Sequence, residues 1–213
     1  MRQRINDLPD PADEPERWRK TRVGLLGGSF NPAHAGHRHI SRAALERLGL
    51  DYVWWLVSPQ NPLKPAAGMA PLEERLAQAR HVADHPRILV TDIERRIGTR
   101  YTAQALERLT AMFPTTRFVW LMGADNLRQI DRWRDWADIF RTVPIAIFDR
   151  PTYSFRAMAG AAARRFKRFE LPQSRARALA HQRPPAWTFI RGGRHPASAT
   201  AIRAARGRRS DPA

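Results

Sequence analysis

The chain contains no cysteine, which excludes disulfide bonds, thiolate nucleophiles and cysteine-ligated zinc or iron–sulfur sites. It also lacks long apolar runs: the run from Val143 to Phe148 is far shorter than the roughly 20 residues that a membrane-spanning helix needs. The charged N-terminus lacks the apolar region of a signal peptide. We therefore expect a soluble, cytoplasmic protein without a membrane partner.

Acidic residues are scarce relative to basic ones, with 20 Asp+Glu against 37 Lys+Arg and a formal net charge of +17. Such a charge attracts anions of every kind, including nucleotides and nucleic acids. Much of the excess follows residue 155, in residues 164–168 and 203–209. An Arg-rich nucleic-acid-binding protein is therefore one alternative. No RNA-binding motif, zinc finger or repeat supports it, so nucleic acid is not the partner we expect.

The length and composition suit one well-buried domain, because 213 residues with 43% apolar content can form a single core. Residues 1–20 are rich in Pro and charged residues, which predicts a flexible extension before a domain at 21–207. Residues 208–213 are expected to form a flexible basic tail. Residues 168–185 interrupt the pattern with several prolines and are expected to be a surface insertion without a clear role.

Within the domain, apolar strand-like runs alternate with helical patterns. The expected strands cover residues 23–26, 52–57, 88–90, 117–122, 143–148 and 187–190. The expected helices cover about residues 36–48, 72–83, 102–112, 154–166 and 198–206, with short helices within 126–141. This alternation predicts an α/β fold with a doubly wound, Rossmann-like parallel sheet. In such a sheet, ligands bind at the carboxyl ends of the strands, where the strand order reverses.

Two histidines follow the first expected strand, in the segment Gly-Gly-Ser-Phe-Asn-Pro-Ala-His-Ala-Gly-His of residues 27–37. Gly27 and Gly28 would let the backbone turn sharply and approach a ligand, and the helix that begins near residue 35 would direct N–H groups at an anion. His34 and His37 are three residues apart, so both can face that anion and donate to phosphoryl oxygens. The segment predicts a phosphate site.

Two further loops carry polar groups at the same expected edge of the sheet. Lys64 lies on the proline-stiffened loop 58–65, where its charge could hold phosphate or simply be solvated. Thr99 or Thr102 could cap the helix that begins near residue 102, which is the alternative to a ligand contact there.

The fourth expected strand ends in Gly123, and Asp125 follows it with a carboxylate suited to ribose hydroxyls or to a metal-bound water. Trp133 could stack on a flat heteroaromatic ring. The alternative is that Trp133 and Trp136, at i and i+3, form a stripe that packs in the core.

The last expected helix begins with Ser-Ala-Thr-Ala-Ile-Arg at residues 198–203. Hydroxyls at the helix start and Arg203 one turn later would make a second site for an anion. A capped amphipathic helix fits the same residues.

The ordered motifs from residue 22 to 206 resemble the H-x-G-H nucleotidyltransferase superfamily and, within it, the bacterial nicotinate-mononucleotide adenylyltransferases. The resemblance rests on His-Ala-Gly-His, on Gly-Ala-Asp-Asn-Leu followed by a Trp, and on the Ser-Ala-Thr-Ala-Ile-Arg segment. It implies a nucleotidyltransferase-type fold and adenylyl transfer from ATP, accompanied by Mg²⁺, to nicotinate mononucleotide, in NAD biosynthesis. Adenylyltransferases that act on pantetheine phosphate or nicotinamide mononucleotide are the nearer alternatives.

The resemblance also implies roles for individual residues, without a resident metal. The residues expected to be catalytic are His34, His37 and Arg203. Those expected to bind ATP are Gly27, Gly28, Ser29, Phe30, His34, His37, Gly123, Asp125, Ser198, Thr200 and Arg203. Those expected to bind nicotinate mononucleotide are Asn31, Lys64, Tyr101, Thr102 and Trp133. Leu63 and Ala199 replace a His and a Ser of the family pattern, so the contacts of those residues do not carry over. Nothing in the sequence indicates an oligomeric state.

Overall fold

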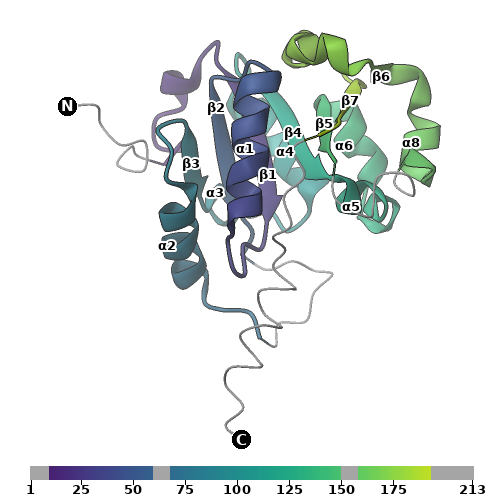
Figure 1. The fold of residues 1–213 in the computed structure, drawn as a ribbon. Helices are drawn as coiled ribbons and strands as arrows, with labels where there is room; N and C mark the ends of the chain where they lie inside the picture. Colours follow the sequence, from purple (N-terminus) through teal and green to yellow (C-terminus); the bar gives the residue numbers. More distant parts are fainter. Residues whose placement is uncertain (1–9, 60–67, 150–157, 193–213) are drawn as a thin grey trace, which may run out of the picture.

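A seven-stranded parallel sheet forms the centre of the computed structural model, which describes residues 10–59, 68–149 and 158–192 (Figure 1). The strands are β1 (Arg22–Gly28), β2 (Tyr52–Val57), β3 (Ile88–Thr91), β4 (Arg117–Gly123), β5 (Ile145–Phe148), β6 (Glu170–Leu171) and β7 (Trp187–Ile190). Their order in the sheet is β3-β2-β1-β4-β5-β7-β6. The predicted doubly wound fold is confirmed.

The strand order reverses between β1 and β4, which pair in parallel with Leu26 opposite Leu121. From this pair the chain builds β2 and β3 on one side and β5, β7 and β6 on the other. The connections after β1 and β4 therefore leave in opposite directions. A crevice at the carboxyl ends of these two strands follows from that topology.

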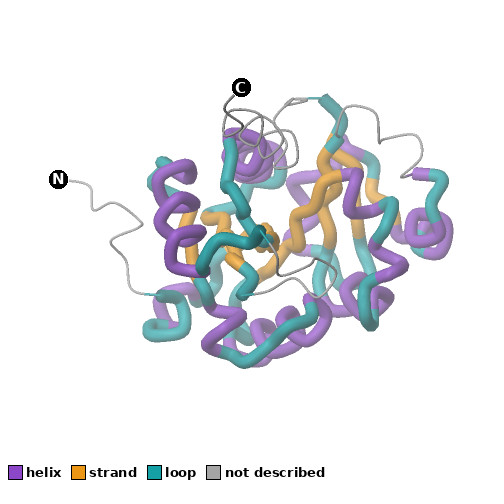
Figure 2. Tube along the Cα trace, turned by 90° about the horizontal axis from the view of Figure 1, so that it is seen from below, coloured by secondary structure: helices purple, strands orange, loops and turns teal. Residues whose placement is uncertain are grey.

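Helices cover both faces of the sheet, as Figure 2 shows from below. One face is covered by α1 (Ala35–Arg47), α2 (Leu72–Ala83) and the 3₁₀ segment η5 (Gln173–His181). The other face is covered by α3 (Ile93–Arg96), α4 (Thr102–Met112), α5 (Ala124–Leu127), α6 (Trp136–Thr142) and α8 (Ala161–Arg165). Shorter 3₁₀ segments are η2 (Pro15–Trp18), η3 (Ile130–Arg132) and η4 (Lys167–Phe169).

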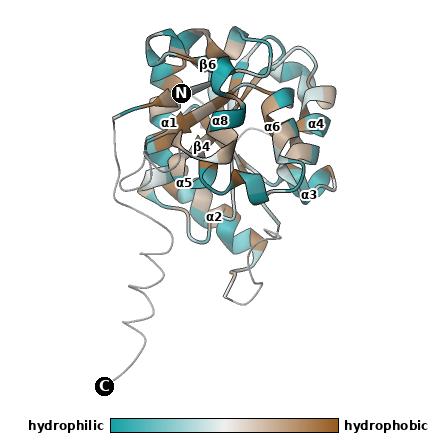
Figure 3. Ribbon diagram, turned by 90° about the vertical axis from the view of Figure 1, so that its right-hand side faces the viewer, coloured by the Kyte–Doolittle hydropathy of each residue, from teal (hydrophilic) through white to brown (hydrophobic). Residues whose placement is uncertain are grey.

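Two buried apolar layers hold the helices to the sheet, because successive side chains of a strand point to opposite faces. On β2, Trp54 belongs to one layer and Trp55 to the other, and both are fully buried. In Figure 3 hydrophobic and hydrophilic residues are mixed along the helices, and the buried hydrophobic ones pack against the sheet. This double burial explains why the strands are continuously apolar rather than alternating.

The fold begins earlier than the sequence predicted. Trp18 is only 1% exposed, and its ring lies 5.1 Å from that of Tyr52 and 4.9 Å from that of Trp54 in edge-on contacts. The flexible extension predicted through residue 20 is therefore wrong for the described residues 10–20. The prediction rested on the charged composition of the segment. Burial of the single Trp18 side chain is enough to pack the segment on the domain despite these charges.

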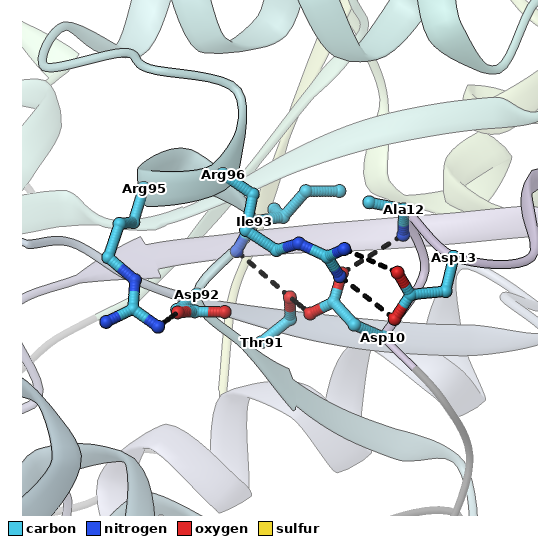
Figure 4. A network of polar contacts seen from close by, with 8 residues as sticks. All are labelled: Asp10, Ala12, Asp13, Thr91, Asp92, Ile93, Arg95 and Arg96. Atoms are coloured by element: carbon cyan, nitrogen blue, oxygen red, sulfur yellow. Dashed lines mark hydrogen bonds and ion pairs between the residues drawn. The ribbon is translucent and has the colours of Figure 1, made fainter.

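Polar contacts fix the start of this segment to the end of β3 and to α3 (Figure 4). The carboxylate of Asp10 accepts a hydrogen bond from the Thr91 hydroxyl and pairs with Arg96 at 3.0 Å. Asp13 pairs with the same guanidinium, which holds the pKa of that carboxyl below its usual range. Two of the charges that suggested flexibility, on Asp10 and Asp13, thus have a partner in the domain.

Residues 168–185 are part of the fold, which corrects the expected surface insertion. They contain β6, which pairs with β7, and η5, whose Ala176, Leu179 and Ala180 are buried against the sheet. The helix expected over 154–166 is described only from residue 158 and is interrupted at Gly160, the N-cap of α8. The helix expected at 198–206 and the tail at 208–213 lie outside the described residues. In the part of the chain that is described, no helix has the length and apolar character to cross a bilayer.

Candidate active site

The two histidines cap the N-terminus of α1 by a reciprocal pair of hydrogen bonds. His34 is the N-cap, with extended backbone angles, and its Nδ1 accepts from the Gly36 N–H at 3.1 Å. The Nδ1 of His37 accepts from the His34 N–H at 3.2 Å. The two ring centroids lie 3.9 Å apart, so the expectation that both rings can face one ligand agrees with their placement.

This pattern assigns the protons of the neutral imidazoles. A ring whose Nδ1 accepts a hydrogen bond carries its proton on Nε2. Both histidines therefore present an Nε2–H donor, His34 from a buried ring and His37 from a half-buried one. Two adjacent donors at the start of a helix, where the helix dipole is positive, suit a phosphoryl group.

Aromatic and hydroxyl side chains contact the ring and the backbone of His37. The Phe30 ring stacks on Trp55 with centroids 5.0 Å apart and lies 4.7 Å from His37. The Ser41 hydroxyl donates to the His37 carbonyl at 2.9 Å and accepts from the Trp55 indole N–H at 2.7 Å. The sequence analysis missed Ser41 and Trp55, which lie within regular elements and carry no motif.

The glycines before the histidines have a different role from the one predicted. Gly27 and Gly28 belong to β1, and neither has a positive φ; the left-handed residue of the turn is Phe30, with φ +46°. A Cβ at Gly27 would lie 2.3 Å from the Trp120 ring, whereas one at Gly28 would lie 3.5 Å from Phe30. Gly27 is therefore required because the Trp120 indole crosses the strand there. The prediction that these glycines form the turn is wrong.

Asn31 connects two loops at the carboxyl edge. Its side-chain N–H donates to the Gly68 carbonyl at 3.0 Å, and its oxygen accepts from the Ala70 N–H at 3.4 Å. Ser29, also predicted to bind ligand, is buried. Lys64, Ser198, Thr200 and Arg203 lie outside the described residues, and their roles stay predictions.

The start of α4 has no side-chain cap. Tyr101 is its N-cap residue and makes no capping hydrogen bond, while Thr102 is already the first helical residue. The Thr99 N–H and hydroxyl instead donate to the Glu94 carbonyl, at 3.0 and 3.4 Å. The alternative that Thr99 or Thr102 caps this helix is therefore wrong.

Trp133 lies in the segment beside that helix start, because the Arg134 guanidinium sits over the Tyr101 ring at 4.8 Å from its centroid. Trp133 is half-buried and packs partly against the core. Trp136 makes edge-on contacts with Phe140 and Phe166, at 6.3 and 6.0 Å between centroids. Of the two tryptophans, Trp133 is the direct chain neighbour of the residue that contacts Tyr101, whereas Trp136 packs against Phe140 and Phe166.

Gly123 ends β4 and is the N-cap residue of α5, and the half-buried Asp125 follows on that helix. Since β4 neighbours β1, Asp125 and the histidines lie at the carboxyl ends of adjacent strands. This agrees with the placement that the sequence predicted for them.

Two buried charged residues near this edge were missed by the sequence analysis. Arg75 is 1% exposed, and burial lowers its pKa. Burial raises the pKa of Glu94 to about 7, against the opposing effect of a hydrogen bond with Ser58. The available signal was the position of Arg75 on α2, among Leu72, Leu76 and Ala79, on the face that packs on the sheet.

Among the described residues, no group of three or more His, Asp or Glu side chains could hold a metal ion.

The fold, the histidine pair and the polar loops at the carboxyl edge define a nucleotidyltransferase site, and comparison with known proteins gives the same class. The model of the cytidylyltransferase-like family matches residues 25–205, and the chain belongs to that family.

Individual relatives and solved structures show which members of this class the chain is similar to. The chain is 54% identical over 182 residues to a protein of Parvibaculum lavamentivorans named "Probable nicotinate-nucleotide adenylyltransferase", covering 85% of this chain and 90% of that protein. It is 56% identical over 182 residues to a protein of the same name from Cereibacter sphaeroides, covering 85% and 96%. The solved structure of Plasmodium falciparum nicotinic acid mononucleotide adenylyltransferase complexed with NaAD shares the fold, with a TM-score of 0.62, 14% identity and coverage of 86% of this chain and 83% of that one.

Proposed function

We propose that this enzyme is a nicotinate-nucleotide adenylyltransferase. It transfers the adenylyl group of ATP to nicotinate mononucleotide and releases pyrophosphate, which is a step of NAD biosynthesis. The observation that carries the proposal is the pair of histidine rings, His34 and His37, which lie 3.9 Å apart at the start of α1 and each accept a main-chain hydrogen bond at Nδ1. Relatives more than half identical to the chain carry the name of this activity.

The reaction needs alignment and charge neutralisation more than acid–base catalysis. A phosphate oxygen of nicotinate mononucleotide attacks the α-phosphorus of ATP, and the bond from that phosphorus to the bridging oxygen of pyrophosphate breaks. The nucleophile is already an anion, so no group has to remove a proton from it. His34 and His37 would donate to the phosphoryl oxygens, where negative charge develops as the bond breaks.

The pyridine end would bind between α4 and the Trp133 segment. The first N–H groups of α4 have no side-chain cap, and they would receive the nicotinate carboxylate as a charge-assisted hydrogen bond. Trp133 would stack on the pyridine ring. Asn31 and Lys64 would complete the mononucleotide side, and Asp125, Ser198, Thr200 and Arg203 the ATP side.

Mg²⁺ would enter as the complex with ATP, because phosphate oxygens and water are the ligands that this ion prefers. We place the reaction in the cytoplasm because ATP is its substrate. Nucleic acid is not proposed as a partner.

The test is pyrophosphate release by the purified full-length chain with Mg²⁺ and ATP, supplied with nicotinate mononucleotide, nicotinamide mononucleotide or pantetheine phosphate. We expect nicotinate mononucleotide to exceed its amide by one to two decades in kcat/KM, since the amide lacks charge-assisted bonds of about 1.5–3 kcal/mol. Turnover with pantetheine phosphate but with neither pyridine nucleotide would reject the proposal.

A second measurement isolates the pyridine site. Trp133→Ala should lower kcat/KM for both pyridine nucleotides and leave the KM for ATP within about twofold, because ring stacking contributes only to the pyridine side. Trp136→Phe is the control, because Trp136 is also half-buried but contacts Phe140 and Phe166. Parental kinetics in the Trp133 variant would assign Trp133 to the core.

A further inference from the structure

The buried guanidinium of Arg75 connects the loop that carries the histidines to both described ends of the next loop. It donates to the carbonyls of Ser29 at 2.8 Å and Ser58 at 2.7 Å through one terminal nitrogen. The other terminal nitrogen donates to Pro59 at 2.8 Å, and Nε donates to Ala70 at 2.9 Å. All four acceptors are main-chain carbonyls.

These carbonyls belong to three separate segments at the carboxyl edge of the sheet. Ser29 follows β1 and precedes His34 by five positions, Ser58 and Pro59 follow β2, and Ala70 precedes α2. One side chain on α2 thus sets where two neighbouring strand-to-helix connections lie relative to each other. The Asn31 amide forms a second, parallel link from the histidine loop to Gly68 and Ala70.

Arginine is the side chain that suits this task. Its planar fork holds donors in fixed directions, so it can satisfy carbonyls that come from different directions at once, whereas a lysine ammonium places its donors on one atom. Burying the charge is costly unless these donors are bonded. Among the described residues, no carboxylate forms an ion pair with Arg75, so the four carbonyls are what compensate it there.

We propose that Arg75 is a positioning residue of the adenylyl-transfer site, which holds the His34–His37 loop in register with the loop after β2. The proposal rests on the proposed function for its kinetic consequence. We assign Arg75 no contact with either reactant, because its guanidinium donates to four main-chain carbonyls. It fixes the backbone of the loop that carries the two histidines. This position matters because small misplacements of catalytic groups lower the rate by large factors.

The experiment compares Arg75→Lys and Arg75→Gln with the parent, and uses Arg80→Gln as the control, because Arg80 is exposed on the same helix. Hydrogen exchange by mass spectrometry is measured on peptides covering 29–34, 56–59 and 68–72, and on β4 and β5. Steady-state kinetics are measured well below the unfolding midpoint of each variant. Arg80→Gln should match the parent in every measurement.

We expect Arg75→Lys to exchange at least about tenfold faster in the three loop peptides and at parental rates in β4 and β5. We expect its kcat to fall by about tenfold or more, with KM values changed by less than kcat. Parental loop exchange, or parental kinetics in a folded variant with a lowered midpoint, would overturn the proposal, because Arg75 would then only stabilise the fold.

Failure of the proposed function and failure of the variants to fold give different results. If the parent shows no turnover with ATP and nicotinate mononucleotide, the proposed function fails, while the exchange data still decide whether Arg75 holds the loops. If neither variant folds, hydrogen exchange in the parent protein decides the question. Loop peptides whose amide hydrogens exchange as slowly as those of β4 and β5 support the proposal. Loop peptides whose amide hydrogens exchange freely overturn it.

Discussion

At the scale of single residues, His34 has two roles that a suitable substitution can separate. Its Nδ1 caps α1, and its Nε2–H is a proposed donor to phosphate. Asparagine is a good N-cap residue and can replace the Nδ1 acceptor, but its shorter side chain cannot place a donor where Nε2 lies. His34→Asn therefore tests the donor without removing the cap.

We expect His34→Asn to lower kcat by about a hundredfold or more, as the loss of a donor to developing charge does, with little change in unfolding free energy. His34→Ala should show the same kinetic loss and also lose about 1 kcal/mol of stability, because the cap is removed. Urea unfolding and steady-state kinetics check both variants. A parental kcat in His34→Asn would contradict the role of His34 as a phosphate donor.

Gly27 and Trp120 form a pair in which the small residue accommodates the large one. Gly27→Ala should destabilise the fold by about 1–3 kcal/mol, because the new Cβ would meet the indole at 2.3 Å. Gly28→Ala is the matched control, with an ordinary 3.5 Å contact. In urea unfolding, Gly27→Ala should cost less in a Trp120→Leu background than alone. Additive losses would show that the indole is not the cause.

At the scale of elements, the four-residue helix α3 joins two parts of the proposed site. The Glu94 carbonyl accepts from Thr99, on the approach to α4, and the Glu94 carboxyl is hydrogen-bonded with Ser58, at the end of β2. The carboxyl is buried, and its pKa rises from 4.5 to about 7. Protonation of this one group is therefore favoured by folding.

The sign of the resulting pH dependence follows from proton linkage. Between pH 4.5 and about 7 the folded chain binds a proton at Glu94 that the unfolded chain has lost, so this contribution to stability is complete below pH 4.5 and is lost as the pH rises through about 7. A difference of this size corresponds to roughly 3 kcal/mol. Glu94→Gln, which is neutral at every pH, should therefore gain about that much relative to the parent between pH 4.5 and 8.

Urea unfolding of parent and variant at pH 4.5, 6, 7 and 8 checks this expectation, and the difference between the two removes the titration of all other groups. Glu107→Gln on the exposed side of α4 is the control and should show no such trend. A difference between parent and Glu94→Gln that stays constant over this range would mean that Glu94 is ionised in the folded protein.

The longer strands and most of the α-helices could be predicted, because continuous apolar strands and helical periodicity are properties of the sequence alone. The short elements α3, β6 and η5 could not, since they are too short or too irregular to show such a pattern. The histidine loop could be predicted because two histidines at this spacing, after a strand and a pair of glycines, are typical of a phosphate site. Arg75 could not, since all four of its acceptors are main-chain carbonyls, which no side-chain pattern encodes. The packing of Trp18 was missed for a related reason, because a single buried ring has no periodicity.

At the scale of the whole molecule, the net charge of +17 acts on every anionic ligand. A surface hollow of about 470 Å³ lies away from the proposed site, at the end of α6 and before β7, near the amino ends of the strands. It is lined by Arg141, Arg165, Phe166, Arg168, Phe169, Pro184 and Pro185. Its arginines contribute to the overall field without reaching the histidines, so they provide a way to test how far that field extends.

Because both proposed substrates are anions, the overall field should raise their encounter rate, and salt should weaken it as the Debye length falls to about 10 Å at 0.1 M. We expect kcat/KM to drop by about threefold to tenfold between 0.03 and 0.3 M KCl, while kcat changes by less than about twofold.

The triple variant Arg141→Gln, Arg165→Gln, Arg168→Gln lowers the charge from +17 to +14, that is 17 − 3, and should reduce the salt dependence with kcat unchanged. Circular dichroism controls for its fold, since Arg165 and Arg168 also stack on aromatic rings. A kcat/KM that is independent of salt in the parent would show that the field has no part in substrate capture; a parental salt slope in the triple variant would confine the effect to charges near the histidines.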